Sequence, residues 1–336
     1  MPELITGRKN ILVTGGAGFI GSHLCDKLVR ENHVICVDNF LSGSQANISH
    51  LLGFPNFVFL KHDMTQPLDL EKYPELEKFK VKFQGIQEIY HLACPTSPKD
   101  FDKYRVETLL ANSEAVKIAL DLTVKYKAKF LFTSSSVVYG PRQKNSPSFR
   151  EDYHGDVDFL SRRACYDEGK RFAETIISTY KSIYGIEAKT ARVFRTYGPR
   201  LKLNEGNMIY DFIADALQNK DLAIFGDKDF SSALCYIDDI VEGLIKLMSL
   251  KKDIGPVNLG SDIEHKLVDV AKGIIEMTKS KSSVVFREAL LFMTPLGLPD
   301  LTKAKEEMGW LPIIGLPEGL KKTIDYAKAA RGVLGV

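Results

Sequence analysis

A tyrosine and a lysine four residues apart are the first side chains in this sequence that suggest proton chemistry. Tyr166 and Lys170 lie in a stretch with helical periodicity, where a spacing of four puts two side chains on one face. A lysine ammonium beside a phenol is expected to lower the phenol pKa from about 10, which lets the phenolate serve as a general base. Such a pair occurs by chance in many helices, so its meaning depends on the residues around it.

A run of serines provides a partner for the phenol. Ser134, Ser135 and Ser136 follow an apolar stretch that reads as a sheet strand, and functional sites gather at the carboxyl ends of such strands. A hydroxyl there can bind an alcohol oxygen and share its proton with the phenol, so we interpret the run as functional rather than as a plain loop. Asn112 is interpreted either as holding a water that relays protons from Lys170 or as a helix-surface residue.

The segment Asn10–Gly21 runs from an apolar strand through glycines into a helix. Gly15 and Gly16 permit a tight turn. Gly18 lets a pyrophosphate approach the backbone, and Gly21 lets the helix pack against the strand. The N–H groups at the start of that helix then point at the phosphates. This strand–turn–helix context predicts a dinucleotide site.

Two aspartates at predicted strand ends refine this prediction. Asp38 ends the second strand, where a carboxylate accepts hydrogen bonds from both ribose hydroxyls and repels a 2′-phosphate, so we expect NAD rather than NADP. Asp63, at the end of the third strand, is expected to meet the adenine, with a solvated turn carboxylate as the alternative. The positive charge of an oxidised nicotinamide would reinforce Lys170 in lowering the pKa of the phenol.

The elements that must position these groups alternate between short apolar strands and longer amphipathic helices up to about residue 194. Strands are predicted over Asn10–Thr14, His33–Asp38, Phe57–Lys61, Glu88–Ala93, Lys129–Thr133 and Glu187–Phe194. Helices are predicted over Phe19–Glu31, Val106–Tyr126 and Cys165–Tyr184. Strands that are apolar on both faces and separated by helices indicate an α/β fold, a Rossmann-type doubly wound parallel sheet covered on both sides.

Beyond residue 198 the pattern changes to helices broken by short strands and many turns. The helices are predicted over Met208–Asn219, Asp238–Ser249, Leu267–Lys279, Leu301–Met308 and Pro317–Ala330. We interpret residues 1–198 as an NAD-binding domain that carries the catalytic residues. Residues 199–336 are interpreted as mainly a smaller C-terminal α/β lobe that binds the substrate at the carboxyl edge of the sheet.

The composition excludes several classes of function. The 336 residues carry 45 Lys and Arg against 43 Asp and Glu, without a basic stripe, so charge gives no case for nucleic acid or an anionic membrane. No apolar run approaches the roughly 20 residues that span a bilayer, and the polar amino terminus does not read as a signal peptide. Five dispersed cysteines read as small core residues, and seven histidines lack ligand spacing, so neither disulfides nor a metal site is predicted. A cytoplasmic protein is expected.

The chain resembles an extended short-chain dehydrogenase/reductase of the NAD-dependent epimerase/dehydratase family over about residues 9–330. It is most similar to the UDP-glucuronate decarboxylase (UDP-xylose synthase) branch of that family. The segments that carry the resemblance are Thr14–His23, His91–Pro98, Cys165–Arg171, Tyr197–Arg200, Pro256–Gly260 and Pro299-Asp300. The Pro-x-Ser-Pro and Tyr-Asp-Glu-Gly-Lys-Arg parts of these segments are characteristic of the branch rather than of the superfamily.

The resemblance implies a role for each matching residue, with Ser135 as the catalytic hydroxyl, Tyr166 as the base and Lys170 as its partner. It implies that NAD is bound by Gly15, Gly18, Phe19, Ile20, Gly21, Asp38, Asn39, Asp63, Met64, Leu92, Ala93, Ser134, Tyr166 and Lys170. It implies that a nucleotide sugar is bound by Pro95, Ser97, Ser136, Arg195 and Arg200. The family oxidises C4 of the sugar with NAD, a C5 carboxylate is then lost from the β-keto acid, and NADH reduces the ketone. The family also pairs its two long helices, here about 106–126 and 165–184, in a homodimer.

Four departures from the branch lie on the substrate side. Val137 stands where decarboxylases have Glu, Arg195 where they have Asn, and Ser232 where they have Arg. The loop Met293–Asp300 lacks the branch's Asp pair and its Arg. Each lost charge-assisted contact costs on the order of 1.5–3 kcal/mol. Arg195 and Arg200 are expected to restore positive charge near the phosphates.

The hydride machinery is therefore intact while the groups specific to decarboxylation are not. We expect C4 oxidation of a nucleotide sugar, with decarboxylation named by overall resemblance and 4-epimerisation or C4 dehydrogenation as rivals. A non-catalytic paralogue that only binds NAD or a nucleotide sugar is a further alternative, disfavoured by the intact catalytic set. A uronate carboxylate facing Val137 and Leu298 would be desolvated without a partner, which favours a neutral sugar. The sequence leaves the sugar, the nucleobase and the fate of the ketone open.

Overall fold

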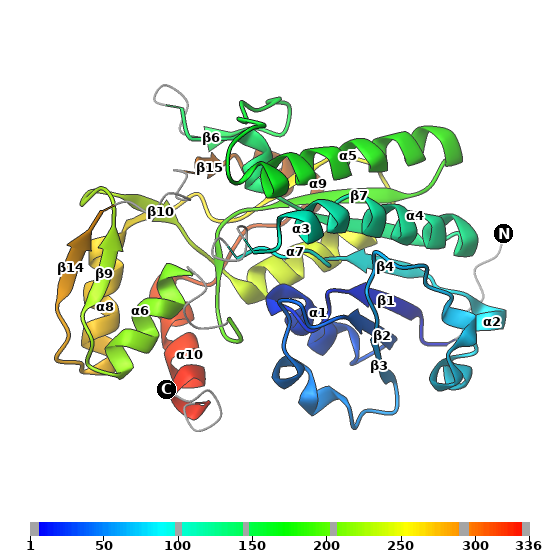
Figure 1. The fold of residues 1–336 in the computed structure, drawn as a ribbon, viewed down its shortest axis with the longest axis horizontal. Coiled ribbons are helices and arrows are strands. Elements are labelled where there is room, and N and C mark those ends of the chain that lie inside the picture. Colours follow the sequence, from blue (N-terminus) through cyan, green and yellow to red (C-terminus); the bar gives the residue numbers. More distant parts are fainter. Residues whose placement is uncertain (1–6, 98–102, 144–147, 202–206, 289–295, 331–336) are drawn as a thin grey trace.

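A seven-stranded parallel sheet forms the centre of the computed structural model (Figure 1), which describes residues 7–97, 103–143, 148–201, 207–288 and 296–330. The strand order is β12-β7-β5-β4-β1-β2-β3. These strands are β1 (Asn10–Thr14), β2 (His33–Asp38), β3 (Phe57–Lys61), β4 (Glu88–His91), β5 (Lys129–Ser135), β7 (Ala188–Val193) and β12 (Val257–Leu259). From β1 the chain adds β2 and β3 on one side and then β4, β5, β7 and β12 on the other. The switch point therefore lies between β1 and β4, and open α/β sheets bind ligands at such a point. The predicted doubly wound sheet is confirmed.

Helices cover both faces of this sheet, and the pattern of buried residues explains why. Alternate residues of β1 point to opposite sides, with Ile11 and Val13 in one hydrophobic cluster and Leu12 in another. The first cluster is completed by α1 (Phe19–Leu28) and α7 (Ile237–Ser249). The second cluster is completed by α4 (Glu114–Tyr126) and α5 (Ala164–Tyr184), beside which lies α3 (Arg105–Ala111).

The second half of the chain builds a smaller group of helices and strands to the left of the sheet in Figure 1. It consists of α6 (Met208–Leu217), α8 (Leu267–Thr278) and α10 (Leu316–Ala329) with the parallel pair β9 (Leu222–Phe225) and β14 (Val284–Arg287). Part of this half returns to the main sheet, because β12 pairs with β7, and α9 (Thr302–Met308) packs beside β12.

Short elements connect these parts. In the N-terminal half of the chain the short helical elements are α2 (Val81–Gln84) and the 3₁₀ helices η1 (Gln45–Asn47), η2 (Ser49–Leu51), η3 (Leu70–Lys72), η4 (Pro74–Phe79) and η5 (Ser136–Tyr139). The short strands pair as β8 (Thr196–Tyr197) with β11 (Cys235–Tyr236), β10 (Ser231–Ala233) with β13 (Glu264–Lys266), and β6 (Ser148–Phe149) with β15 (Leu298–Pro299). The last pair joins the segment after β5 to the segment before α9.

The helix predicted over Val106–Tyr126 is wrong in one respect, since the structure divides it into α3 and α4. The break falls at Asn112 and Ser113, where Ser113 has φ −123° and ψ −80°. The side chain of Asn112 donates to the carbonyl oxygen of Thr108 at 2.9 Å and so competes with the helical hydrogen bond. Periodicity alone does not reveal such a local competitor.

Several predicted boundaries also shift by one to three residues. The first helix ends at Leu28 rather than Glu31, and β4 ends at His91 rather than Ala93. The strand β5 continues to Ser135, so two of the three serines belong to the strand rather than to the turn after it. Only residues 296–300 of the predicted loop Met293–Asp300 lie in the described part of the chain.

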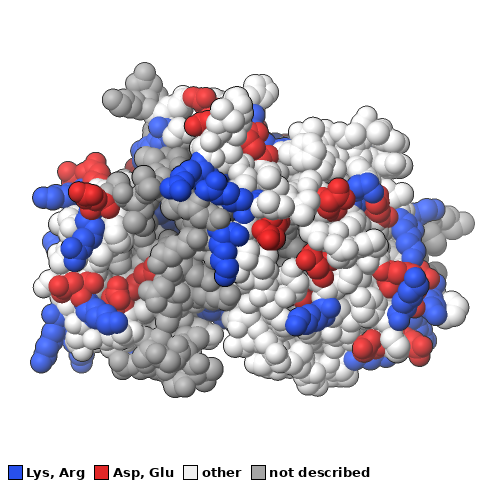
Figure 2. Space-filling model, viewed as in Figure 1, with Lys and Arg blue, Asp and Glu red and all other residues white. Residues whose placement is uncertain are grey.

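The surface carries both signs of charge. Figure 2 shows acidic and basic side chains interspersed over this face, as a formal net charge of +2 leads one to expect. Within the described residues, no helix has the combination of length and hydropathy needed to cross a bilayer.

We predict that the packing of α7 on the sheet contributes strongly to stability. Leu244 is fully buried on α7, and Leu244→Ala should lower the free energy of unfolding by about 2–5 kcal/mol because it leaves a cavity. Urea unfolding followed by circular dichroism measures this. The control is Leu311→Ala, at a side chain that is 43% exposed, which should cost less than about 0.5 kcal/mol. Equal losses in both variants would contradict the packing described.

Candidate active site

A cavity of about 1070 Å³ opens at the carboxyl ends of β1, β2, β4 and β5. Its volume slightly exceeds the usual range of about 300–1,000 Å³ for a site that holds one small molecule. Every residue that the sequence assigned to catalysis, cofactor or substrate lines this cavity, from Gly15 and Asp38 to Arg195 and Arg200. Two other predicted positions do not, since neither Ser232 nor Leu298 belongs to its lining.

The glycine turn has the shape that a pyrophosphate requires. Gly15 has φ +72° and lies so close to the backbone of Ala93 that any side chain would collide with it. An added Cβ on Gly21 would overlap the carbonyl oxygen of Gly15. Helix α1 begins after Gly18 with no side-chain cap and no acidic residue in its first turn. Its free N–H groups therefore fit an anion, and the turn fits NAD.

Asp38 is held rigidly at the edge of the same cavity. Its Oδ2 accepts from the N–H of Ala17 at 3.0 Å and its Oδ1 from the N–H of Phe40 at 2.8 Å. These bonds fix the carboxylate at the cavity wall, where its oxygens are suited to accept from ribose hydroxyls. The residue is buried, which makes an added negative charge beside it costly. This arrangement suits the hydroxyls of NAD better than a 2′-phosphate.

Asp63 lies further along the cavity in a more open setting. Partial burial opposes ionisation, but hydrogen bonds from the backbone and hydroxyl of Thr65, each 2.9 Å long, lower its pKa. The residue is thus both a turn carboxylate and part of the cavity wall. Its contact with the adenine stays a prediction.

The three predicted catalytic groups meet where α5 crosses the end of β5. Tyr166 and Ser135 are joined by a side-chain hydrogen bond. Lys170 donates from Nζ to the carbonyl oxygen of Thr133 at 2.9 Å, and its Nζ lies 5.8 Å from the centre of the Tyr166 ring. The phenol, the hydroxyl and the ammonium therefore share one wall of the cavity.

The expected lowering of the Tyr166 pKa is wrong for the protein groups by themselves. Burial raises this pKa well above 10, the nearby thiol of Cys94 adds to the rise, and the hydrogen bond from Ser135 opposes it without outweighing it. Burial also lowers the pKa of Lys170, which weakens the ammonium as a source of positive charge. An oxidised nicotinamide bound in the cavity would add positive charge that favours the phenolate.

Asn112 lies inside the protein, so its interpretation as a helix-surface residue is wrong. Its side chain is 1% exposed, packs against Gly169 of α5 and donates to the sulfur of Cys94 at 3.1 Å. Among the described residues its Oδ1 has no partner, although a buried acceptor usually has one. The proton relay through Asn112 stays a prediction.

Cationic side chains lie on the substrate side of the cavity. Arg195 makes no ion pair or hydrogen bond through its guanidinium with any described residue, and burial together with Arg163 lowers its pKa to about 10, which still leaves it charged. Arg200 is tied to Asp26 of α1 by an ion pair of 2.6 Å. Sequence reasoning missed Arg163, which directly precedes α5 and is marked only by its position one turn before Tyr166.

The wall beside the phenol is apolar. Val137, Cys165 and Tyr166 form one buried cluster, against which Cys94 and Leu296 pack. The prediction that Leu298 faces the substrate is wrong, because Leu298 pairs with Ser148 in the β15–β6 ladder while Leu296 lines the cavity. All five cysteines are free, and Cys94 belongs to the cavity wall rather than to the core. Burial raises the pKa of Cys94, which favours the neutral thiol.

Comparison with known proteins agrees with this geometry. The sequence profile of the "NAD dependent epimerase/dehydratase family" matches residues 11–260. UDP-glucuronic acid decarboxylase 1 of Xenopus tropicalis is 39% identical over 320 residues, which cover 95% of this chain and 72% of that protein. UDP-glucuronic acid decarboxylase 6 of Arabidopsis thaliana is 39% identical over 312 residues, which cover 92% of this chain and 86% of that protein.

Solved structures with a similar fold include nucleotide-sugar epimerases. The UDP-glucose 4-epimerase of Thermotoga maritima, solved with UDP-glucose, has a TM-score of 0.83 at 28% identity and covers 96% of this chain and 99% of that one. The UDP-glucuronic acid 4-epimerase of Bacillus cereus, solved with UDP-glucuronic acid and NAD, has a TM-score of 0.83 at 27% identity and covers 95% and 99%.

We predict that Asp38 selects NAD over NADP. Asp38→Ala removes the acceptors for the ribose hydroxyls, so affinity for NAD should fall by about tenfold or more, while affinity for NADP should fall less. Calorimetric titration of both nucleotides measures this. Asp63→Ala is the control, because loss of a contact to the adenine should weaken NAD and NADP equally. Equal affinity of the unmodified protein for NAD and NADP would contradict the assignment.

Proposed function

Because the chain belongs to the NAD dependent epimerase/dehydratase family, we propose that it oxidises C4 of a nucleotide sugar and does not decarboxylate a uronate. The observation that carries the proposal is the meeting of Ser135, Tyr166 and Lys170 in the cavity that also holds the glycine turn. The ketone formed at C4 is then reduced again, which gives a 4-epimerase, or released, which gives a dehydrogenase.

NAD, when bound, supplies the acceptor for the hydride of the C4 carbon and afterwards the donor for its return. The chain's own groups move the proton. Tyr166 takes the proton of the C4 hydroxyl, and Ser135, already bonded to the phenol, holds the same oxygen during the transfer. The Thr133 carbonyl fixes the ammonium of Lys170 beside them, where its charge favours the phenolate.

The substrate side of the cavity supports a nucleotide sugar whose ring is neutral. Arg163 and Arg195 line the cavity and provide cations suited to a diphosphate. Arg163 also pairs with Asp167 at 3.3 Å, whereas the guanidinium of Arg195 has no such partner among the described residues. Val137, Cys165 and Leu296 instead surround the phenol with apolar surface. A carboxylate placed against that surface would lose its hydration without gaining a partner, at a cost of several kcal/mol.

The decarboxylase alternative is favoured by the relatives at 39% identity rather than by the site. The decarboxylase branch that the chain resembles has an acid at the position of Val137 and an arginine at the position of Ser232. The first position is apolar here, and the second lies outside the cavity lining, with its hydroxyl bonded to the oxygen of Ala233. The non-catalytic alternative would leave the catalytic set without a purpose.

We also propose that residues 199–336 mainly hold the nucleotide sugar against the NAD-binding part. Asn207, Met208, Phe225 and Leu234 come from this half of the chain and line the common cavity. They face the residues contributed by β1, β2, β4 and β5, so a substrate in the cavity contacts both parts. Reaction in the cavity thus depends on both halves of the chain.

A homodimer through the helices of about 106–126, which are α3 and α4, and of about 165–184, which is α5, is part of the proposal. Large apolar side chains on these helices remain exposed, among them Val106 at 63%, Phe172 at 54% and Ile183 at 66%. Leaving such side chains in water is unfavourable, and a second copy of the same helices would cover them.

Tyr166→Phe should lower turnover of the true substrate by about 10²-fold or more, the usual contribution of a general base. The fold and the affinity for NAD should remain nearly unchanged, because only one hydroxyl is lost. Steady-state kinetics on a panel of nucleotide sugars measures the effect. The matched control is Tyr184→Phe, which removes the hydroxyl of an exposed tyrosine on the same helix. Near-normal turnover in Tyr166→Phe would show that another group is the base.

UDP-glucuronate should be a poor substrate, whereas a neutral nucleotide sugar should be oxidised at C4. Carbon dioxide release from UDP-glucuronate is followed beside NADH absorbance with neutral sugars. Interconversion without NADH accumulation indicates an epimerase, and accumulation indicates a dehydrogenase. Fast, stoichiometric release of carbon dioxide would overturn the proposal and restore the decarboxylase assignment. Val137→Glu, which returns the missing acid, is the matched variant.

A further inference from the structure

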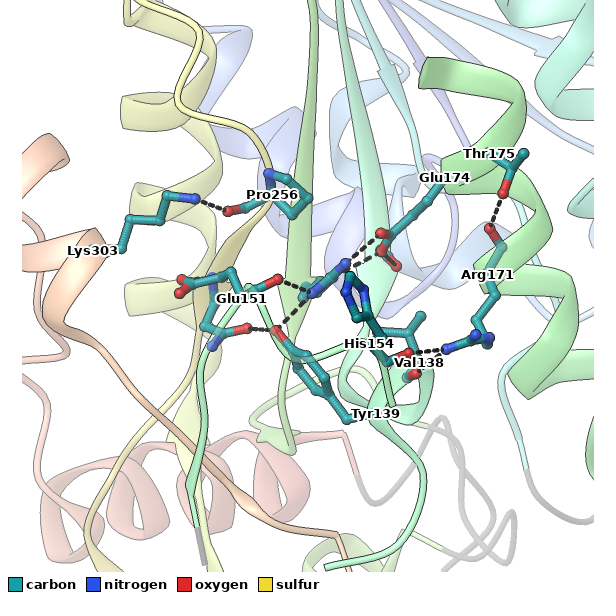
Figure 3. Close-up of polar contacts among 12 residues, drawn as sticks. Val138, Tyr139, Glu151, His154, Arg171, Glu174, Thr175, Pro256 and Lys303 are labelled. Atoms are coloured by element: carbon teal, nitrogen blue, oxygen red, sulfur yellow. Dashed lines mark hydrogen bonds and ion pairs between the residues drawn. The ribbon is translucent and has the colours of Figure 1, made fainter. Parts of the chain in front are cut away.

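Glu174 lies on α5 one helical turn beyond Lys170 and points toward the ends of the sheet strands (Figure 3). Its Oε1 accepts from the hydroxyl of Ser134 at 2.6 Å and from Nε of Arg192 at 3.0 Å. Its Oε2 accepts from Nη2 of Arg192 at 2.7 Å. The carboxylate thus joins α5 to β5 and β7 through short, charge-assisted bonds.

Arg192 is fixed from its other side as well. Its Nη1 donates to the phenol oxygen of Tyr139 at 2.9 Å and to the carbonyl oxygen of Glu151 at 3.0 Å (Figure 3). The Tyr139 hydroxyl in turn donates to Asn258 of β12 at 2.7 Å. Because Tyr139 and Asn258 are fully buried, this arrangement has little freedom to move, and it holds Glu174 in one place.

The same helix is bonded to the β5 end at two neighbouring points. Lys170 donates to the Thr133 carbonyl at 2.9 Å, and Arg171 donates to the Val138 carbonyl at 2.9 Å. Glu174 adds the bond to Ser134, the residue directly before the catalytic hydroxyl. These bonds set the distance between the helix that carries Tyr166 and the strand that carries Ser135.

Glu174 also affects the charge of Lys170. The titratable groups that interact with Lys170 are His91 of β4, Cys94 after β4, and Tyr166 and Glu174 of α5. Burial and Lys170 lower the pKa of His91 to about 3, so this ring is neutral. Burial raises the pKa of Cys94 and of Tyr166, so both are uncharged near neutral pH. Cys94 and the Glu174 carboxylate both oppose the effect of burial on the ammonium, and of the two Glu174 is the one held in place by an ion pair to Arg192.

We propose that Glu174 is a positioning residue of this active site, which orients the strand end beside Ser135 and provides the counter-charge of Lys170. The inference rests on the proposed function for its effect on turnover, but the state of Lys170 can be measured without turnover. A merely structural Glu174 would support the helix and leave the protonation of Lys170 unchanged. The two roles therefore give different pH profiles.

The sign of the effect follows from the charges. Lys170 must be protonated to favour the phenolate, so activity falls on the basic side as Lys170 loses its proton. Glu174→Gln removes the negative charge and should move that basic limb to lower pH by about one unit, the smaller end of the range for a neighbouring charge. Arg192→Gln leaves the Glu174 carboxylate without its neutralising partner and should move the limb to higher pH.

Three further variants separate charge from shape. Ser134→Ala removes a hydrogen bond to Glu174 but keeps the carboxylate, so it should lower kcat without moving the basic limb. Glu174→Asp keeps the charge and should restore the limb toward that of the unmodified protein. Glu168→Gln removes a negative charge from a partly exposed position on the same helix and should change neither kcat nor the position of the basic limb.

The experiment combines kcat profiles between pH 6 and 10 with trace labelling of Lys170 by acetic anhydride over the same range, read by mass spectrometry. Labelling reports the unprotonated amine whether or not a substrate is turned over. An absence of turnover in the unmodified protein would refute the proposed function, and the labelling curves alone would then test the inference. Shifts in opposite directions for Glu174→Gln and Arg192→Gln support it. Folded variants with unshifted curves, or with shifts in the same direction, overturn it.

Discussion

The ammonium of Lys170 lies in a site nearly closed to water, beside a phenol that is buried as well, and the surrounding structure compensates for this burial. Burial alone works against the ionised form of both groups, raising the pKa of Tyr166 and lowering that of Lys170. The Thr133 carbonyl and the Glu174 carboxylate partly compensate for the ammonium. The phenolate is supported by the hydrogen bond from Ser135 and by the positive charge of Arg163, which together do not outweigh burial. A positively charged cofactor bound in the cavity would add to this support.

Three of the four departures from the decarboxylase branch lie in segments that follow or precede strands. Val137 comes shortly after β5, Arg195 shortly after β7, and Leu296 shortly before β15, whereas Ser232 lies within β10. Such connecting segments accept changes that the strands themselves do not, because fewer core contacts depend on them. The proposed catalytic groups, in contrast, are attached to β5 and α5 through several hydrogen bonds. A change of substrate is therefore compatible with the proposed C4 oxidation.

Local sequence was sufficient for the parts of the site that one strand–turn–helix unit builds. The glycines at 15, 18 and 21 and the carboxylate of Asp38 lie in the cavity, because the turn that needs them is short and its conformation is determined by neighbouring residues. Long-range features were not visible in this way. Arg163 and Leu296 reach the cavity only through the packing of distant segments, and the break at Asn112 depends on a side-chain bond within the helix. The rise in the Tyr166 pKa depends on burial by residues from several elements, which a spacing of four residues does not reveal.

The fate of the ketone follows from what the cavity offers to negative charge. Loss of carbon dioxide from a β-keto acid moves the negative charge of the carboxylate onto the ketone oxygen. An enzyme therefore accelerates this loss only if it stabilises charge on the ketone oxygen more than charge on the carboxylate. Oxidation and re-reduction at C4 need no such difference, because the charge that develops is confined to the oxygen shared by Tyr166 and Ser135. The apolar cluster of Val137, Cys165 and Leu296 gives a carboxylate no partner, so it opposes the binding of a uronate. The cations of Arg163 and Arg195, if they engaged a carboxylate, would stabilise it before the reaction and so slow its loss. The first feature argues against a uronate as the substrate and the second against its decarboxylation, while the proposed proton and hydride transfer at C4 needs no carboxylate.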